Sequence, residues 1–280
     1  MFKYLNPKRF YYAVGKKKFF EFILLAVFLL FFYGPLIHMV ILAFGNTYEA
    51  PHVLPTEWGF KWWKLIFQQD ELVSSIFMSI LVALLTTGVS LLFCIPAAYA
   101  LARFNFKGRK LFMFSFLLTN AFPKLGIYTS IGLLFYKYNL MGTLPGVVII
   151  HIINTMMFMV WLPSGAFRSI HKQQEEAALD VGATRFQTFM KITMPMAMPG
   201  IAVACIYTFL GSMEEAQGTL LVGLPTIKTM AVAMYGVILD YPIQAGAVFA
   251  IILIIPTIIM IFLLRKYIGP EAMAGGFKMK

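Results

Sequence analysis

Charged residues, cysteine and histidine are all scarce in this sequence of 280 residues. Only 12% of the residues are charged, whereas 60% are hydrophobic, and one soluble core of this size cannot hide so much apolar material. The two cysteines, Cys94 and Cys205, lie in apolar runs without metal-ligand spacing, and we expect them to pack as ordinary core residues. The four histidines share no helical spacing, so a metal site is not expected. The composition favours a protein embedded in lipid.

Acidic residues are also few, and the excess of positive charge needs an explanation. There are 23 Lys and Arg residues against 12 Asp and Glu, which gives a net charge of +11. Most of the basic residues fall in alternate connections of the chain, at 1–18, 103–110, 168–191 and 265–280. This is the positive-inside distribution of membrane proteins, and it predicts that both termini lie in the cytoplasm. The basicity therefore reports topology, and no nucleic-acid partner is expected.

Six apolar stretches are long enough to cross a hydrocarbon layer of about 30 Å as helices. They lie near 19–44, 73–101, 111–136, 142–167, 197–223 and 243–264. Proline interrupts several of them, which membrane helices tolerate. The first has no small-residue cleavage site after it and is expected to be a retained helix, not a signal peptide. The sequence thus predicts an all-α integral membrane protein, with a six-helix domain at 19–267 between cytoplasmic segments at 1–18 and 268–280.

The connection at 168–196 differs from the others because it is too long for a turn and too regular for a flexible linker. A helix-forming run stops near Gly182, and apolar residues then recur at helical spacing before Pro195 and Pro199 close the segment. We expect two short helices outside the membrane, separated by a glycine break. An amphipathic segment in this position has an apolar face that needs a partner.

The same connection carries a four-part motif at fixed spacing. It reads Glu176, Ala177, Ala178, three residues, Gly182, nine residues, then Ile192, Thr193, Met194 and Pro195. This resembles the EAA motif of the permease subunits of binding-protein-dependent ABC importers, with methionine where leucine is usual, a change that conserves volume. The likeness covers about residues 70–267. It implies a six-helix ABC importer permease bundle whose cytoplasmic coupling helix docks on an ATPase subunit.

Eight residues of this loop are candidates for ATPase coupling. They are Glu175, Glu176, Ala177, Ala178, Asp180, Gly182, Ile192 and Pro195. The small alanines permit close approach to a partner, the glycine permits a sharp turn, and the acidic side chains can pair with basic groups of the partner. The alternative is a helix that lies on lipid headgroups, which is disfavoured because its acidic residues would face an anionic surface.

The resemblance also implies partners and cofactors. The partners are a second homologous permease subunit, two cytoplasmic ABC ATPase subunits and an extracytoplasmic solute-binding protein, assembled in the inner membrane. This chain has no G-x-x-x-x-G-K-[ST] loop to hold phosphates. We therefore expect no cofactor and no enzymatic activity in this chain, with ATP and Mg²⁺ held by the ATPase subunits.

Ionisable residues within the apolar stretches are candidates for the solute path, because a charge at membrane depth costs a few kcal/mol. Lys124 lies near the middle of the third stretch, beside Asn120, and Glu214 and Glu215 lie in the fifth. Two other interpretations stay open. Lys124 pairs with one of the acids and holds two helices together, or it extends to the membrane interface.

Resemblances within the importer family point to two classes of solute. Segments 135–146, 161–167 and 274–278 resemble maltose-type carbohydrate and polyol permeases, whereas 58–67, 180–182 and 212–215 resemble polyamine, opine and phosphonate permeases. An unpaired Lys124 in the path would repel a polycation. A sugar, polyol or acidic sugar-like solute therefore ranks first. A stand-alone channel or secondary transporter is a remote alternative, since no inverted repeat is apparent.

Overall fold

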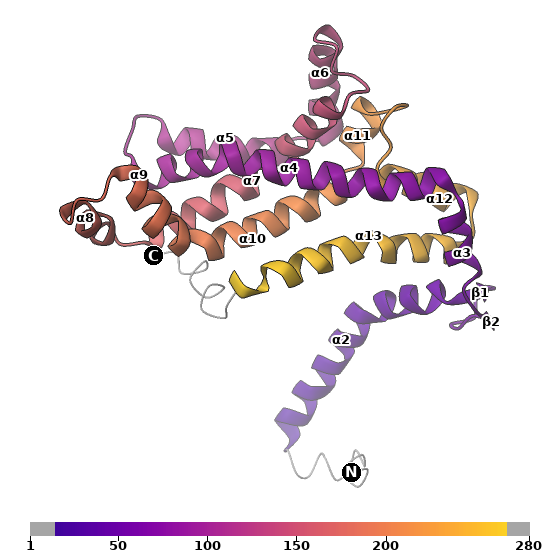
Figure 1. Ribbon diagram of the computed structural model, residues 1–280. Helices are drawn as coiled ribbons and strands as arrows, with labels where there is room; N and C mark the ends of the chain where they lie inside the picture. Colours follow the sequence, from indigo (N-terminus) through magenta and orange to yellow (C-terminus); the bar gives the residue numbers. More distant parts are fainter. Residues whose placement is uncertain (1–14, 268–280) are drawn as a thin grey trace. The chain divides into compact units, whose positions relative to one another are not determined.

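The computed structural model describes residues 15–267, and these are mainly helical (Figure 1). Five helical segments are long and apolar enough to cross a membrane: Lys17–Ala43, Asp70–Arg103, Leu144–Ser169, Arg185–Met213 and Ile243–Tyr267. A sixth crossing is reached if two further helices, bent by 103° at their junction, form one broken span. The predicted all-α membrane fold is confirmed. The predicted tail at 268–280 and most of the predicted segment at 1–18 lie outside the described residues.

The elements follow one another as α2 (Lys16–Ala43), β1 (Gly45–Thr47), β2 (Glu57–Trp58), α3 (Lys61–Gln68), α4 (Asp70–Arg103), α5 (Arg109–Ala121), α6 (Lys124–Lys137), α7 (Leu144–Ser169), α8 (Lys172–Asp180), α9 (Arg185–Thr188), η2 (Phe189–Thr193), α10 (Met194–Met213), α11 (Gln217–Val222), α12 (Met230–Asp240), α13 (Ile243–Leu264) and η3 (Arg265–Tyr267). The chain divides into two compact units. The first holds the described residues up to Ile66 together with Tyr241–Ile251. The second holds Phe67–Asp240 and the described residues from Ile252 onward.

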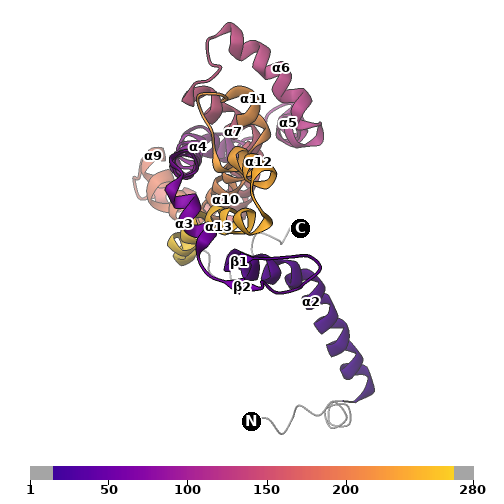
Figure 2. The same cartoon turned by 90° about the vertical axis from the view of Figure 1, so that its right-hand side faces the viewer.

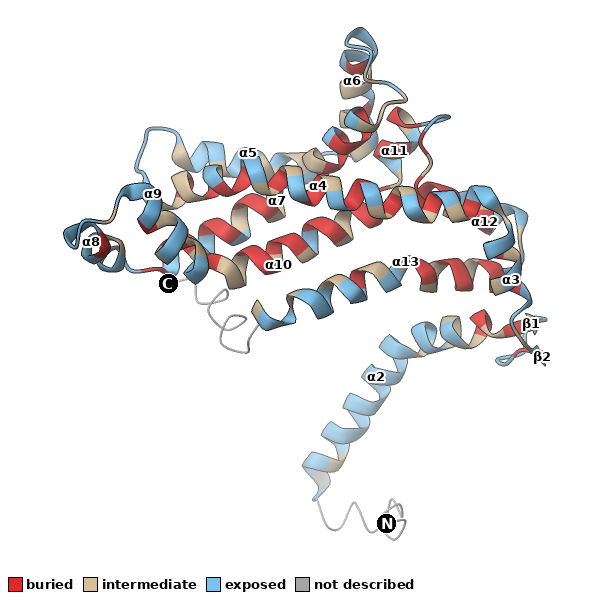
Figure 3. Ribbon diagram, in the orientation of Figure 1, coloured by how far each residue is buried: buried red, intermediate tan, exposed pale blue. Residues whose placement is uncertain are grey.

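In the first unit, α2 is apolar on all sides and exposed along most of its length (Figure 3). After it, β1 and β2 form an antiparallel pair. Two indole N–H groups of α3 hold it against the preceding elements: Trp62 donates to the carbonyl of Asn46 in β1 at 3.0 Å, and Trp63 donates to that of Ala43 at the end of α2 at 2.7 Å. An apolar helix that the rest of its own unit does not cover is typical of a helix that faces lipid or another chain.

The second unit is built on α4, α7 and α10, which pack against one another. Figure 2 looks nearly along these three helices, and Figure 3 shows the buried residues concentrated on them. Their shared core includes Ala98, Phe167 and Ala204, which are fully buried. Cys94 and Cys205 are free, buried members of the same core, so the expectation of ordinary packing is confirmed.

The prediction that Pro195 and Pro199 close the loop before the fifth span is wrong. One continuous helical segment, Arg185–Met213, runs from α9 through the π-helical turn η2 into α10. Pro195 lies in the first turn of α10 and Pro199 in its interior. A π-helical turn changes the backbone hydrogen-bond register, and it accommodates a proline that cannot donate to the preceding turn. Of the two short helices expected in this connection, α8 is the one that forms a separate helix.

Two predicted spans are divided in the structure, the third at a proline that interrupts its apolar stretch and the fifth at a point that the sequence did not mark. The third is divided between α5 and α6 because Phe122 precedes Pro123 and takes the extended conformation that such a position favours. The fifth ends at Met213, and α11 forms a separate helix after a short break that contains Glu214 and Glu215. Lys124 thus begins a helix, and the two acids lie between helices.

Candidate functional site

The loop that carries the motif folds around a left-handed glycine. Gly182 has φ of +89°, and it ends α8 by donating its N–H to Leu179 at 2.9 Å while Ala183 donates to Ala178 at 3.0 Å. This is the arrangement that commonly terminates helices, and glycine adopts it without the steric penalty of a side chain. Space around Gly182 is open. The predicted glycine break is confirmed.

The next helical segment begins with a reciprocal cap. The Thr184 hydroxyl accepts the N–H of Gln187 at 3.2 Å, and the Gln187 side chain accepts the N–H of Thr184 at 2.9 Å. This capping box satisfies backbone donors that a helix start leaves unpaired. It fixes the start of α9 at Arg185, three residues after Gly182. The turn between the two helices is therefore short and defined.

The candidate coupling residues divide between two faces. Glu176, Ala177, Asp180, Gly182 and Pro195 are exposed. Ala178, in contrast, is only 7% exposed and packs within its own chain, so the prediction that both alanines meet a partner is wrong for this one. Ile192 is half-buried in η2. An exposed strip on α8 and the turn after it is the part that a partner can contact.

Glu175 faces the interior of its own chain, which corrects the expectation that it pairs with basic groups of a partner. Its Oε1 accepts hydrogen bonds from Arg103 Nη2 at 2.9 Å, Arg103 Nε at 3.2 Å and Thr193 Oγ1 at 2.7 Å. Arg103 Nη1 also donates to the carbonyl of Ile170 at 3.0 Å. The sequence reasoning missed Arg103 as a site residue because a basic residue at the end of a span was read only as a mark of topology.

A second buried carboxylate lies in the break between α10 and α11. Glu215 Oε2 is 3.5 Å from Lys124 Nζ and accepts the Tyr128 hydroxyl at 3.1 Å, while its Oε1 accepts the N–H of Gly218 at 2.8 Å. These three donors offset the cost of burying a charge. The structure therefore shows the pairing alternative for Lys124. The Glu215 side chain is 2% exposed, whereas that of Lys124 is 40% exposed.

A buried histidine forms hydrogen bonds on both sides of the break between α10 and α11. His151 of α7 bonds Ser212 through Nδ1 and Thr219 through Nε2, both at 2.7 Å. The ring thus joins α7 to the end of α10 and to α11, an interhelical role in keeping with a polar residue in an apolar bundle. Gly218 permits the close approach of α11, since a Cβ there would collide with Ile150 of α7. Among the residues that the structure describes, no cluster of three His, Cys, Asp or Glu side chains is placed to hold a metal ion.

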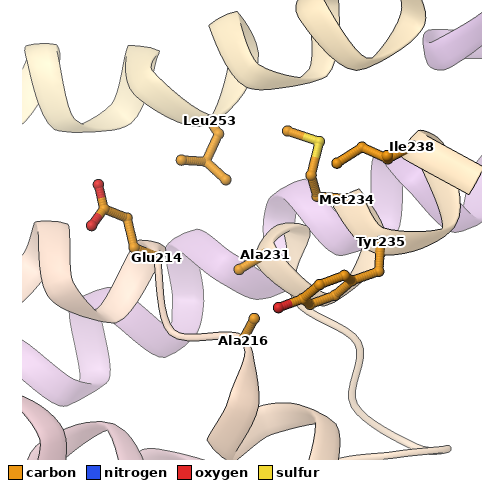
Figure 4. Close-up of a pocket in the computed structure, with 7 residues that line it drawn as sticks. All are labelled: Glu214, Ala216, Ala231, Met234, Tyr235, Ile238 and Leu253. Carbon is orange, nitrogen blue, oxygen red and sulfur yellow. The ribbon is translucent and has the colours of Figure 1, made fainter. Parts of the chain in front are cut away.

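Glu214 lines a cavity of about 310 Å³ beside this break. The other residues that line it are Ala216, Ala231, Met234, Tyr235, Ile238 and Leu253. Figure 4 shows Glu214 on one side of the cavity and Tyr235 on the other. Within the described residues the Glu214 carboxylate forms no hydrogen bond or ion pair. The cavity therefore combines apolar walls with one carboxylate and one phenol.

The four candidate path residues are not gathered into one cluster. Lys124 and Glu215 are paired, while Glu214 lies against the cavity just described. Asn120 is exposed near the end of α5 and donates to Thr119 Oγ1 at 3.3 Å. Tyr128 and Tyr235 belong to these surroundings, and nothing in their local sequence distinguished them from other aromatic residues of the spans.

Comparison with known families places a match over residues 90–273, from the second half of α4 onward. The matching family is described as binding-protein-dependent transport system inner membrane component. The match includes the Gly182 turn, Glu175 with both of its side-chain partners, and the Lys124–Glu215 pair.

The chain is similar to individual curated proteins along most of its length. It is 28% identical to the diacetylchitobiose uptake system permease protein NgcG of Streptomyces coelicolor, over 87% of this chain and 83% of that one. It is 28% identical to the trehalose transport system permease protein SugB of Mycobacterium tuberculosis, over 83% of this chain and 87% of that one. A solved structure, a bacterial ABC transporter involved in the import of the acidic polysaccharide alginate, has a chain of the same fold, with a TM-score of 0.65 and 20% identity over 95% of this chain and 99% of that one.

Proposed function

The chain belongs to the family of binding-protein-dependent transport system inner membrane components, and we propose that it forms the membrane path for a sugar or polyol in an ABC importer. Membership makes it a multi-pass inner-membrane protein and not an enzyme. The observation that carries the proposal is the exposed strip on α8, presented by the Gly182 turn at one end of the α4, α7 and α10 bundle (Figure 1).

The ATPase contact is the exposed strip of Glu176, Ala177 and Asp180 together with the Gly182 turn. Two ATPase subunits hold ATP and Mg²⁺, a second homologous permease completes the path, and an extracytoplasmic binding protein delivers the solute. This arrangement is supported by the lack of a phosphate-binding loop in this chain and by the binding-protein dependence of its family. The distribution of basic residues supports placing the α8 end in the cytoplasm.

The proposal of a sugar or polyol rests on the relatives and on the cavity beside Glu214. The relatives are named for diacetylchitobiose and trehalose uptake. A carboxylate can accept hydrogen bonds from sugar hydroxyl groups, and apolar walls with an aromatic ring suit the carbon faces of a sugar. The unpaired charge of Glu214 makes this cavity better suited to a neutral sugar than to an acidic one.

A polyamine-like cation is the second candidate, and one observation favours it. Glu215 neutralises Lys124, so the repulsion that an unpaired lysine would exert on a polycation is largely removed. Glu214 then provides the unpaired charge of the cavity, and this charge attracts cations.

Thermal stabilisation of the purified solute-binding protein by trehalose, diacetylchitobiose, glucuronic acid and spermidine separates these classes of solute. We expect one of the two neutral sugars to raise its melting temperature most.

The Gly182→Asp variant tests the ATPase contact. The aspartate must adopt the left-handed backbone conformation of the turn, which is unfavourable for a residue with a side chain. It also adds a negative charge to the docking surface. We expect insertion to be unchanged and uptake into proteoliposomes to fall about tenfold or more, the factor given by about 1.4 kcal/mol of weaker docking. Gly108→Asp is the matched control, because Gly108 has φ of +84° and open space but lies in another loop. Normal uptake by the Gly182 variant would contradict the assignment of this loop.

A further inference from the structure

Glu175 and Glu176 are adjacent on α8 but have opposite surroundings. Glu175 is 14% exposed at its side chain and has three donors on one oxygen, whereas Glu176 is exposed and has no side-chain partner among the described residues. We propose that Arg103, Glu175 and Thr193 form a junction that passes the movement of α8 to α4 and α10 together. In this junction Arg103 is a positioning residue. The inference rests on the proposed function, in which α8 contacts the ATPase.

The junction joins the ends of separate helices at one point. Arg103 is the last residue of α4, Glu175 lies in the first turn of α8, and Thr193 is the last residue of η2, directly before α10. Arg103 additionally donates to Ile170, which caps the end of α7. One carboxylate and one guanidinium thus connect α8 to all three helices of the core. A displacement of Glu175 therefore acts on α4 and α10 at once.

Side-chain hydrogen bonding from α8 to the core is concentrated in Glu175. Of the described residues of α8, it is the one whose side chain bonds to the membrane helices or to η2. The Arg103 side chain is 7% exposed. Charge-assisted hydrogen bonds in such dry surroundings are stronger and less screened than surface pairs, and removal of one partner leaves the other charge buried. The junction is therefore stiff enough to transmit a displacement.

The π-helical turn η2, which ends at Thr193, is held in the core by aromatic packing. Phe189, the first residue of η2, packs edge-on against Tyr99 of α4 with 4.9 Å between the ring centres, and it also contacts Phe167 of α7. Single π-helical turns are local departures from the α-helical register and often occur at functional sites. With Phe189 held in the core, a pull on Thr193 is directed along α10. The π-helical turn is the place where the register of this segment can adjust.

A junction that only stabilises the fold predicts something different from one that transmits movement. In the first case, weakening it lowers stability but leaves ATP-driven changes in the core intact. In the second case, the ATPase still binds and hydrolyses ATP, but α4 and α10 no longer respond. Hydrogen exchange measures both properties. Exchange of 172–181 in the free permease reports the strength of the junction, and exchange of α4 and α10 in the assembled complex, with its ATPase, second permease and binding protein, reports the response to added MgATP.

Two variants weaken the junction to different extents. Arg103→Gln removes the cation, and Thr193→Val removes one hydroxyl donor with little change of shape. In the free permease, we expect amide exchange in 172–181 to become roughly tenfold faster in the Arg103 variant and about threefold faster in the Thr193 variant. In both variants the ATPase stays bound. The MgATP-dependent change of exchange in α4 and α10 is reduced in both, and more strongly in the Arg103 variant than in the Thr193 variant. If Arg103→Gln does not fold, Thr193→Val decides the matter alone.

Glu176→Gln is the matched control, one residue away on the exposed side. It should leave exchange in 172–181 unchanged in the free permease and weaken binding of the ATPase. The junction is refuted if Thr193→Val speeds exchange in 172–181 but leaves the MgATP response of α4 and α10 at the wild-type level, or if it changes neither. A different result bears on the proposed function itself: if the ATPase gives no protection to 172–183 in the wild-type complex, α8 is not its docking site.

Discussion

Two ion pairs that join separate helices of the second unit, Arg103–Glu175 and Lys124–Glu215, use the same chemistry in different surroundings. Arg103 and Glu175 are 7% and 14% exposed at their side chains, so both charges are enclosed. Lys124 is 40% exposed while Glu215 is 2% exposed, so this pair is enclosed on one side only. The acid of each pair also has hydrogen-bond donors other than its cation. The first pair is thus suited to fix helices, and the second leaves a cation accessible.

The largest expected effect follows from removing the cation of the enclosed pair. Arg103→Met leaves Glu175 buried without its cation, and Thr193 alone remains to bond it. Breaking a buried pair in this way costs about 3–5 kcal/mol. We expect a clear fall in the melting temperature of the purified permease in detergent. A second change, Glu175→Met, should recover most of the loss, because it removes the unpaired charge.

Removal of the cation from the Lys124–Glu215 pair should lower the free energy of unfolding by less. In Lys124→Met, Glu215 keeps the Tyr128 hydroxyl and the Gly218 N–H as donors, and the lysine side chain is less enclosed than that of Arg103. We expect a loss of about 1–2 kcal/mol, measured by the same thermal unfolding. Glu215→Gln in that background should restore stability. A loss equal to that of Arg103→Met would show that the two pairs are equivalent, against the comparison drawn from their exposure.

The smallest effect on stability is expected at Glu214, which has no side-chain partner among the described residues. Glu214→Gln should change the free energy of unfolding by no more than about 0.5 kcal/mol. Its effect should instead be on solute selection, because the variant removes the unpaired charge of the cavity. In proteoliposomes we expect trehalose uptake to be retained and the relative uptake of an acidic disaccharide to rise. Loss of trehalose uptake with no change in selection would place Glu214 outside a charge-selecting role.

Much of the architecture was available from the sequence because it depends on local patterns. Apolar runs of membrane length located the spans, and the glycine at the end of a helix-forming run located the turn at Gly182. The sequence marked Pro123 as an interruption of the third span, but the 103° bend there and the break near Glu214 were not predicted. Apolar composition continues through both, and average hydropathy does not register a change in backbone direction. At Pro195 the sequence predicted a break, but the helix continues because a π-helical turn precedes the proline.

The sequence by itself determined the membrane class, the motif and the position of its turn, since these follow from residue types within short windows. Tertiary structure alone decided that Glu175 faces inward and Glu176 outward. Neighbouring residues on a helix point about 100° apart, so the rotation of α8 against its neighbours sets which acid is enclosed. Tertiary structure also decided which cation pairs with each acid, because Arg103 and Glu175 are 72 residues apart in the chain and Lys124 and Glu215 are 91 apart. Pairing over such distances depends on how helices pack, which no local pattern of residues specifies.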